Sequence, residues 1–344
     1  MNILLGISSF VCLSSRVGSF LIYVWLALQP CMQSTPLEVI YYNRVGKAGS
    51  SFVCNLLKKK ISRCNSDCPF HLYIPADRYL QTELQPLQTV LSRNWTKPTV
   101  IFAHQNFITG DQPYKAIDSV NNKTVHVKYI NFLRNPISRS VSGYYYAIDA
   151  RLRGQSAKQV LKRREEDPVC GCCNLSYSEC VETSETRNCS SNSLLISGQL
   201  SFFLTWSESQ LYEKNRCTDW ETYLKIAVAR LRYSYEAVGV LEHMVVSLTV
   251  FAKLLPSVFS GIVNLTLPHS AKRATSEYDS LTHKAENILT NNICNKAELE
   301  FYNLAVQDLY DRYHYIEYTG AISNLPTYVP THLRSYPPFF LPNV

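Results

Sequence analysis

The sequence predicts an α/β fold in which a central, mostly parallel sheet is flanked by helices. The β-rich residues 39–42 run through a glycine-containing loop into a segment of helical composition. The apolar runs Thr99–Ala103, Val125–Leu133 and Tyr235–Leu241 also read as strands, and each ends in polar residues. Parallel sheets of this kind bind their ligands at the carboxyl ends of the strands. At 344 residues the chain has room for one large domain with insertions, or for two smaller domains.

The loop after the first strand, residues 43–51, has the composition of an anion-binding site, and we call it the anion loop. Its two glycines allow a ligand to approach the backbone, Lys47 adds a charge, and the following helical segment offers N–H groups at its N-terminus. A Walker A motif needs Gly-x-x-x-x-Gly-Lys before Ser or Thr, whereas Lys47 precedes Gly49 here. A nucleoside triphosphatase is therefore disfavoured. Taken alone, the loop is equally compatible with a basic turn that binds nothing.

The N-terminal stretch indicates the secretory pathway. Residues 3–28 are mostly apolar with Arg16 as their one charged residue, which predicts a signal peptide or signal anchor within residues 1–34. Five Asn-x-Ser/Thr sequons support this compartment, at Asn94, Asn122, Asn174, Asn188 and Asn264. Lys and Arg outnumber Asp and Glu by 34 − 27 = 7. This excess favours a polyanionic partner without choosing between nucleic acid, anionic lipid and sulfated sugar.

The 12 cysteines fit an oxidising lumen, where they are expected to form disulfides. Cys12 and Cys31 fall in the leader, which leaves 12 − 2 = 10 for the rest of the chain. Five of these cluster, namely Cys170, Cys172, Cys173, Cys180 and Cys189. The cluster lacks two separated Cys-x-x-Cys pairs and has no histidine nearby, so disulfides fit it better than zinc. The connectivity is left open.

Further polar groups follow the next two strands. His104 stands directly after the strand Thr99–Ala103. Arg134 precedes a helix start at Pro136, and Ser142 follows about two helical turns later. An arginine with a nearby hydroxyl suits a phosphate group, although each of these residues is on its own equally compatible with a structural role.

Beyond these motifs, the chain reads as helices joined by loops. Helices are expected at residues 52–61, 77–92, 219–232, 244–255, 281–290 and 296–315. Residues 151–164 form the densest basic stretch and would line a groove for a polyanion. A loop spans residues 262–276, and the Pro-rich tail, residues 321–344, has no packing pattern.

Two motifs, Tyr42–Ser51 and Leu133–Tyr146, resemble the cofactor motifs of Golgi sulfotransferases, and most of all those of the uronosyl 2-O-sulfotransferases. Shorter matches such as Ser178–Val181 and Glu300–Tyr302 extend the resemblance from about Val39 to Tyr315. It implies a P-loop-like sulfotransferase fold for residues 35–320. It also implies the donor 3′-phosphoadenosine 5′-phosphosulfate and no metal.

The resemblance also implies a role for single residues. His104 would be the general base, and Lys47 would neutralise charge on the leaving phosphate. The residues that would hold the 5′-phosphosulfate are Arg44, Lys47, Ala48, Gly49, Ser50 and Ser51. Those that would hold the 3′-phosphate or close over the nucleotide are Arg134, Ser142, Lys272, Arg273 and Thr275. The sugar chain would meet Arg151, Arg153, Lys162 and Arg163, and a family-like disulfide would join Cys180 to Cys189.

The implied function is transfer of a sulfuryl group to the 2-hydroxyl of uronic acids in a glycosaminoglycan, either heparan sulfate or dermatan/chondroitin sulfate. The enzyme would be a single-pass type II protein of the Golgi membrane, with the polysaccharide and not nucleic acid as its partner. The interval between Leu28 and the first strand is very short, which keeps secretion open. The acceptor, and whether the protein forms a homo-oligomer, are also left open.

Departures from the family pattern keep a second function in view. Gly46 and Ala48 stand where the family commonly has Pro and Thr or Ala, which loosens the anion loop. Asn135 replaces the usual Asp, and Phe102 occupies the position of a first histidine. These residues motivate the alternative of a catalytically weak or inactive relative that binds sulfated glycans. A nucleotide kinase is poorly supported, because the Walker A spacing is lacking.

Overall fold

The computed structural model describes residues 37–64, 67–74, 97–107, 125–154, 175–186, 195–196, 198–265 and 281–319. Five parallel strands form one sheet in the order β2-β3-β1-β4-β5. The predicted α/β class, with a central parallel sheet flanked by helices, is confirmed. The expected leader at residues 1–34, the expected helix at residues 77–92 and the tail at residues 321–344 lie outside the described residues.

Strand β1 lies at the centre of the sheet and pairs with β3 and β4. The strands are β1 (Leu37–Asn43), β2 (His71–Tyr73), β3 (Thr99–Ala103), β4 (Val125–Leu133) and β5 (Tyr235–Val240). Every residue of β3 is buried, as are all but one of β1. Because such strands are covered on both faces, they read in the sequence as continuous apolar runs, which is why they were predicted. The edge strand β2 was missed, because its three half-buried residues form no pattern.

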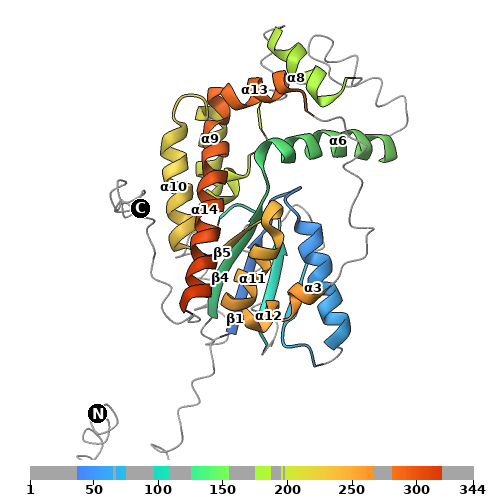
Figure 1. Cartoon of the computed structure of the whole chain (residues 1–344), viewed down its shortest axis with the longest axis vertical. Coiled ribbons are helices and arrows are strands. Elements are labelled where there is room, and N and C mark those ends of the chain that lie inside the picture. The colour runs from blue at the N-terminus through green and yellow to red at the C-terminus, as the bar shows by residue number, and fades with distance from the viewer. Residues whose placement is uncertain are drawn as a thin grey trace, which may run out of the picture.

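Helices cover the sheet on both sides and at its carboxyl edge. They are α3 (Ser50–Cys64), α6 (Pro136–Gly154), α8 (Tyr177–Thr186), α9 (Trp206–Asn215), α10 (Trp220–Tyr233), α11 (Met244–Leu254), α12 (Pro256–Phe259), α13 (His283–Asn291) and α14 (Lys296–Thr319). Short 3₁₀ turns are η4 (Leu200–Phe203), η5 (Leu241–His243), η6 (Ile262–Asn264) and η9 (Ile293–Asn295). In Figure 1, α6 crosses above the carboxyl ends of the strands, with α8 and α13 beyond it.

Aromatic side chains fill the core between the sheet and its helices. The ring of Tyr42 packs edge-on against Phe102, and Phe132 packs against Phe251 of α11, with ring centroids 4.4 and 4.9 Å apart. A Cβ on Gly239 of β5 would stand 2.5 Å from a ring carbon of Phe132, so this position has no room for a side chain. The sheet therefore fits closely under α11.

A second, smaller cluster joins α6, α8 and α13. Its buried members are Tyr177, Val181, Ala285 and Leu289. The hydroxyl of Tyr144 on α6 donates to the carbonyl of Leu175, 2.8 Å away, just before α8. Helix α13 begins at His283, whereas the sequence predicted a start at Leu281. The cluster therefore holds the start of the described segment 281–319 against α6 and α8.

The cysteines within the described residues are only partly paired. Cys217 is bonded to Cys294, which closes 77 residues of chain and ties the end of α9 to the start of α14. Cys180 is disulfide-bonded, but its predicted partner Cys189 lies outside the described residues.

The expectation that the cysteines would all pair is wrong for three of them, because Cys54, Cys64 and Cys68 are free. Cys54 is buried against the sheet on α3, whereas Cys68 donates to the sulfur of Cys64 at 3.0 Å.

Within the ranges given above, no helix is both long and apolar enough to cross a bilayer.

Candidate functional site

The polar residues predicted to follow the strands all lie at the same edge of the sheet, where the strands end. Asn43, the last residue of β1, stands beside Ala103, the last residue of β3. Leu133 at the end of β4 stands beside Val240 at the end of β5. Because neighbouring parallel strands end at a common edge, the residues that follow them start from that edge. These are the anion loop, His104, Arg134 and Glu242.

The anion loop connects β1 to α3 and has an unusual backbone. The N–H of Arg44 still donates to the carbonyl of Ala103, 2.8 Å away, so the ladder continues into the first loop residue. Lys47 and Gly49 then take the left-handed conformation, with φ of 65° and 79°. Residues other than glycine rarely adopt this conformation, and those that do are often found at functional sites. Such a turn before a helix N-terminus is the type of backbone concavity that binds anions.

The two glycines of the loop have different surroundings. A Cβ on Gly49 would lie 2.7 Å from Leu241 Cδ1, and φ at this residue is 79°. A Cβ on Gly46 would meet His104 Cε1 at 3.7 Å, which is an ordinary contact. Gly49 is therefore required by space and by conformation, whereas Gly46 is not required by space.

We expect Gly49→Ala to lower the free energy of unfolding by about 1–3 kcal/mol, through strain and a clash with Leu241. Gly46→Ala, the matched control, is expected to change it by less than about 1 kcal/mol, because alanine restricts the unfolded chain. Urea unfolding followed by circular dichroism measures both values. Equal stability of the two variants would contradict the packing described for Gly49.

His104 is oriented by the backbone of the anion loop. Its Nδ1 lies 3.0 Å from the carbonyl oxygen of Arg44, and its side chain is exposed. Since a carbonyl oxygen can only accept a hydrogen bond, Nδ1 carries the proton in this arrangement. In the neutral ring Nε2 is then the nitrogen with the lone pair. His104 is thus set up to accept a proton at Nε2.

Arg134 is held at both its backbone and its guanidinium. Its N–H donates to Gln199 Oε1 at 3.0 Å, and its carbonyl accepts from Gln199 Nε2 at 2.6 Å. Its Nη1 donates to the carbonyl of Lys47 at 3.4 Å. Burial lowers the pKa of Arg134, and the carboxylate of Glu242, 4.0 Å from Nε, opposes that shift. Arg134 therefore joins the end of β4 to the anion loop.

Glu242 follows β5 and contributes the acidic group of this edge. Its two oxygens accept from the N–H of Asn135, 3.0 Å away, and from the hydroxyl of Tyr302, 3.1 Å away. The carboxylate therefore links the start of α6 to α14 while it faces Arg134. A carboxylate in this position favours a charged, ordered guanidinium.

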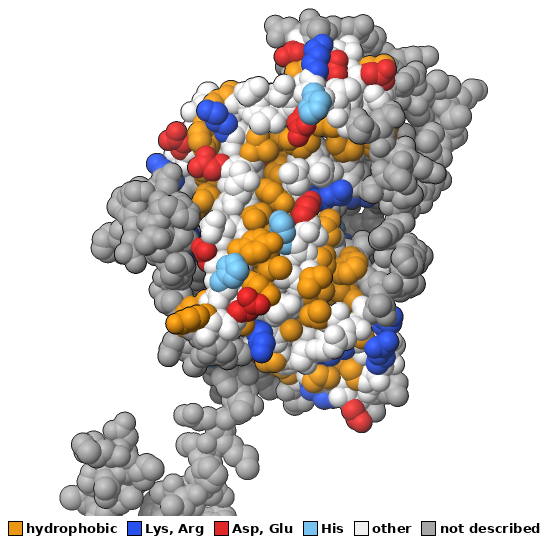
Figure 2. Space-filling model, viewed as in Figure 1, with side chains coloured by type: hydrophobic (Ala, Val, Ile, Leu, Met, Phe, Trp, Pro, Cys, Tyr) orange, Lys and Arg blue, Asp and Glu red, His pale blue; other side chains and the backbone are white. Residues whose placement is uncertain are grey.

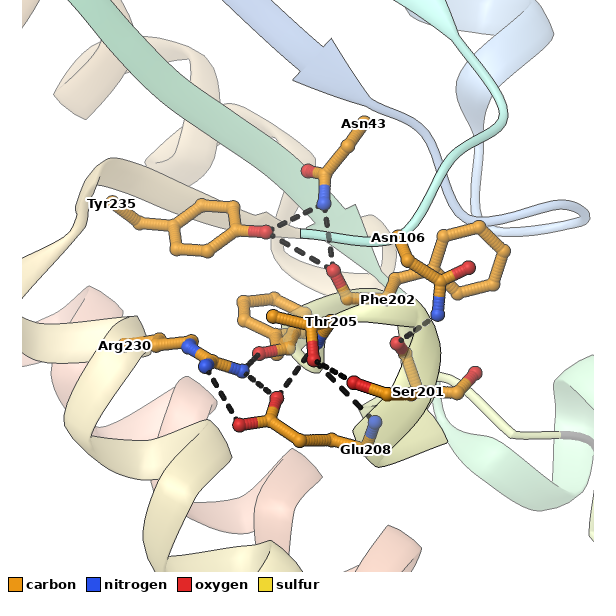
Figure 3. A network of polar contacts seen from close by, with 10 residues as sticks. Asn43, Asn106, Ser201, Phe202, Thr205, Glu208, Arg230 and Tyr235 are labelled. Carbon is orange, nitrogen blue, oxygen red and sulfur yellow. Dashed lines mark hydrogen bonds and ion pairs between the residues drawn. The ribbon is translucent and has the colours of Figure 1, made fainter. Parts of the chain in front are cut away.

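A network of hydrogen bonds around η4 holds the residues at the strand ends (Figure 3). Asn43 Nδ2 donates to the carbonyl of Phe202 at 2.7 Å and to the hydroxyl of Tyr235 at 2.6 Å. Asn106, just after β3, donates to the carbonyl of Ser201 at 3.0 Å. Burial raises the pKa of Tyr235, which keeps this hydroxyl neutral. The segment η4 thus ties the ends of β1 and β3 to the side chain of Tyr235, the first residue of β5.

The other predicted site residues are placed as follows. Ala48 is fully buried, and Ser50 is buried whereas Ser51 is exposed at the first turn of α3. Ser142 is half-buried on α6. The backbone of Arg151 and Arg153 continues α6, but their side chains are not described. Asn264 is exposed at the end of η6.

The predicted residues outside the description are Lys162, Arg163, Cys189, Lys272, Arg273, Thr275 and the sequons at Asn94, Asn122, Asn174 and Asn188.

Three buried polar residues near the site were missed, namely Arg139, Gln199 and Glu298. Arg139 belongs to the same motif as Arg134, and an arginine between the helix start at Pro136 and the tyrosine run was a usable signal. Gln199 and Glu298 lie far along the chain, and no spacing connects them to the motifs.

The face drawn in Figure 2 carries mixed charge. Among the described residues on that face, Lys and Arg side chains are scattered between hydrophobic and acidic ones. In the part of the chain that the structure describes, no group of three or more His, Cys, Asp or Glu residues is arranged to hold a metal ion.

Comparison with known proteins identifies distant relatives. No protein-family model matches the chain. Heparan sulfate 2-O-sulfotransferase 1 of Gallus gallus is 27% identical over 281 residues, which cover 78% of this chain and 70% of the relative. The protein of the same name from Cricetulus griseus is 26% identical over 281 residues, and that from Pongo abelii is 26% identical over 279, with the same coverage.

Proposed function

Because the chain is a distant member of the uronosyl 2-O-sulfotransferase family, we propose that it is a glycosaminoglycan sulfotransferase. The donor that we propose is 3′-phosphoadenosine 5′-phosphosulfate. The acceptor is the 2-hydroxyl of a uronic acid in heparan sulfate or dermatan/chondroitin sulfate. The observation that supports this proposal best is the meeting of the anion loop, His104 and Arg134 at one edge of the sheet.

The groups at this edge suit a phosphosulfate donor. The N-terminus of α3 offers N–H groups and a positive dipole end beside Lys47 and Arg44. We propose that this part of the anion loop holds the 5′-phosphosulfate. Arg134, together with Ser142 of the same sequence motif, would hold the 3′-phosphate. Lys272, Arg273 and Thr275 are proposed to cover the nucleotide, and this role rests on the sequence alone.

The reaction requires one proton acceptor and positive charge at the leaving group. In the proposed mechanism the uronic acid hydroxyl attacks the sulfur, and its proton passes to His104 Nε2. The bond between sulfur and the bridging phosphate oxygen breaks, and its electron pair stays on the nucleotide phosphate. The ammonium group of Lys47 stabilises the negative charge that develops there. The hydrogen bond from Nδ1 to Arg44 keeps the ring in the tautomer that this step needs.

We further propose the cellular arrangement that the sequence predicts. Residues 1–34 would anchor the protein as a single-pass type II protein of the Golgi membrane, or direct its secretion. Residues 35–320 would form the lumenal domain, residues 321–344 an extended tail, and the basic stretch 151–164 would bind the sugar chain. Exposed Asn264 is accessible for glycosylation, in keeping with this compartment.

The proposal is tested by incubating the purified protein with radiolabelled donor and with heparan, dermatan or chondroitin chains lacking 2-O-sulfate. Disaccharide analysis is expected to find new sulfate on the 2-hydroxyl of uronic acid in at least one chain type. Binding of the nucleotide without sulfation of any of the three would overturn the proposal.

A sulfated-glycan-binding module is the second candidate, and one observation favours it. Phe102, at the position of a first histidine in the family, is 1% exposed and its ring packs against Tyr42. This position therefore offers no second base to the edge of the sheet. A binding module would retain salt-sensitive heparin affinity and show no turnover.

A further inference from the structure

We propose that Arg139 is a positioning residue that holds the anion loop in the shape required by the donor, an inference that rests on the proposed function. Arg139 lies on the first turn of α6 and is 8% exposed. Its Nε donates to the carbonyl of Gly46 at 2.7 Å. This is a charge-assisted hydrogen bond between a buried guanidinium and the loop backbone.

Arg134 makes the second contact of the same kind. Its Nη1 donates to the carbonyl of Lys47 at 3.4 Å, so two arginines of one motif hold consecutive carbonyls of the loop. In a planar trans peptide the carbonyl and the next N–H point in opposite directions. The N–H groups of Lys47 and Ala48 are therefore turned away from the arginines. The two arginine contacts thus fix the direction of two amide groups in the loop that would bind the anion.

The charge of Arg139 is maintained although it is buried. Burial lowers its pKa to about 10, an effect that Glu298 opposes and Arg134 reinforces. The guanidinium therefore stays protonated at neutral pH. Glu298 in turn accepts from the N–H groups of Gln199 and Leu200 at 2.7 and 3.2 Å. Glu298 thereby connects Arg139 to the segment that carries η4.

The contact of Arg139 matters because the residue that it holds is a glycine, Gly46. A glycine in the loop has more conformational freedom than the proline that the family commonly has at this position. A hydrogen bond to the carbonyl of Gly46 restricts that freedom in the folded protein. Arg139 would therefore supply, through a side chain, rigidity that the loop backbone lacks.

Arg216 provides a matched control. It is 3% exposed, and like Arg139 it acts on the pKa of Glu298 as a neighbouring positive charge. However, its Nε and Nη2 donate to the carbonyls of Cys294 and Ile196, both at 3.0 Å, and neither belongs to the anion loop. Arg216→Met thus removes a comparable buried guanidinium without touching the loop.

The experiment compares Arg139→Met, Arg139→Lys and Arg216→Met by hydrogen exchange without nucleotide and by titration with 3′-phosphoadenosine 5′-phosphate. We expect amides 46–51 to exchange faster in both Arg139 variants than in the wild type, but not in Arg216→Met. We expect the Kd for the nucleotide to rise about tenfold in the Arg139 variants alone. Adding Gly46→Ala is expected to restore part of this affinity. Arg139→Lys keeps a charge beside Glu298, so it serves if Arg139→Met does not fold.

Equal effects of the Arg139 and Arg216 variants on loop exchange and on nucleotide affinity would overturn the inference, because both would then act only through Glu298. If the wild type itself does not bind the nucleotide, the proposed function fails. The exchange comparison still tests the contact with the loop in that case, since it is made without nucleotide.

Discussion

Replacing His104 by alanine is expected to lower kcat by about 10²–10⁴-fold, the usual contribution of a general base. The reason is that the hydroxyl proton loses its acceptor at Nε2, whose availability is set by the hydrogen bond from Nδ1 to the carbonyl of Arg44. The Kd for 3′-phosphoadenosine 5′-phosphate is expected to stay within about twofold, because the proposal assigns the nucleotide phosphates to the anion loop and Arg134 rather than to His104. Steady-state kinetics and calorimetry measure the two quantities.

His243 is the control for this substitution. It also follows a strand of the same sheet, but its Nδ1 lies 3.0 Å from the hydroxyl of Tyr310, on the side of α14. His243→Ala is expected to retain kcat within about threefold. If His104→Ala keeps wild-type turnover, another group accepts the proton, and if it keeps heparin binding while the wild type has no turnover, the protein is a binding module.

Replacing Lys47 by methionine is expected to lower kcat by about 10²–10³-fold, the range seen when one preorganised electrostatic group is removed. The left-handed backbone at this residue, with φ of 65°, places the side chain in the turn between β1 and α3. The charge of Lys47 would act on the leaving phosphate, so the fold-decrease in kcat should exceed the fold-change in nucleotide affinity. Single-turnover assays with saturating donor separate the two effects.

Lys60, on α3, is the matched lysine. Its Nζ donates to the carbonyls of Val258 and Ser260 at 2.8 and 2.9 Å, so Lys60→Met removes a lysine that joins α3 to α12. That variant is expected to lose stability and keep its kcat. A Lys47→Met variant with unchanged kcat would show that the leaving group is stabilised by other charges.

The fold was predictable where local sequence and burial agree. Strands β3 and β4 were predicted with their observed bounds, because each is a short apolar run followed by polar residues. Helix α9 was missed, since it is polar on most of its surface and buries only Ser209 and Tyr212. Its capping box, formed by Thr205 and Glu208, was a local signal that could have revealed it.

The sequence predicted only those residues of the site that directly follow a strand. The anion loop, His104 and Arg134 each follow a buried strand, so their meeting at one edge follows from a parallel sheet. Gln199 could not be found in this way, because it contacts Arg134 from 65 residues further along the chain. The side chain of Gln199 makes hydrogen bonds with both the N–H and the carbonyl of Arg134. Such a contact depends on the tertiary fold and leaves no periodic pattern in the sequence.

The network around η4 also bears on the order in which the protein can be completed during synthesis. Asn43 meets the carbonyl of Phe202 across 159 residues, and the N–H of Gln199 meets Glu298 across a further 99. A nascent chain that contains the anion loop and all five strands therefore still lacks Glu298, which accepts a hydrogen bond from the backbone just before η4. We expect chains truncated before α14 to bind no nucleotide, so nucleotide binding can report whether synthesis of the chain has been completed.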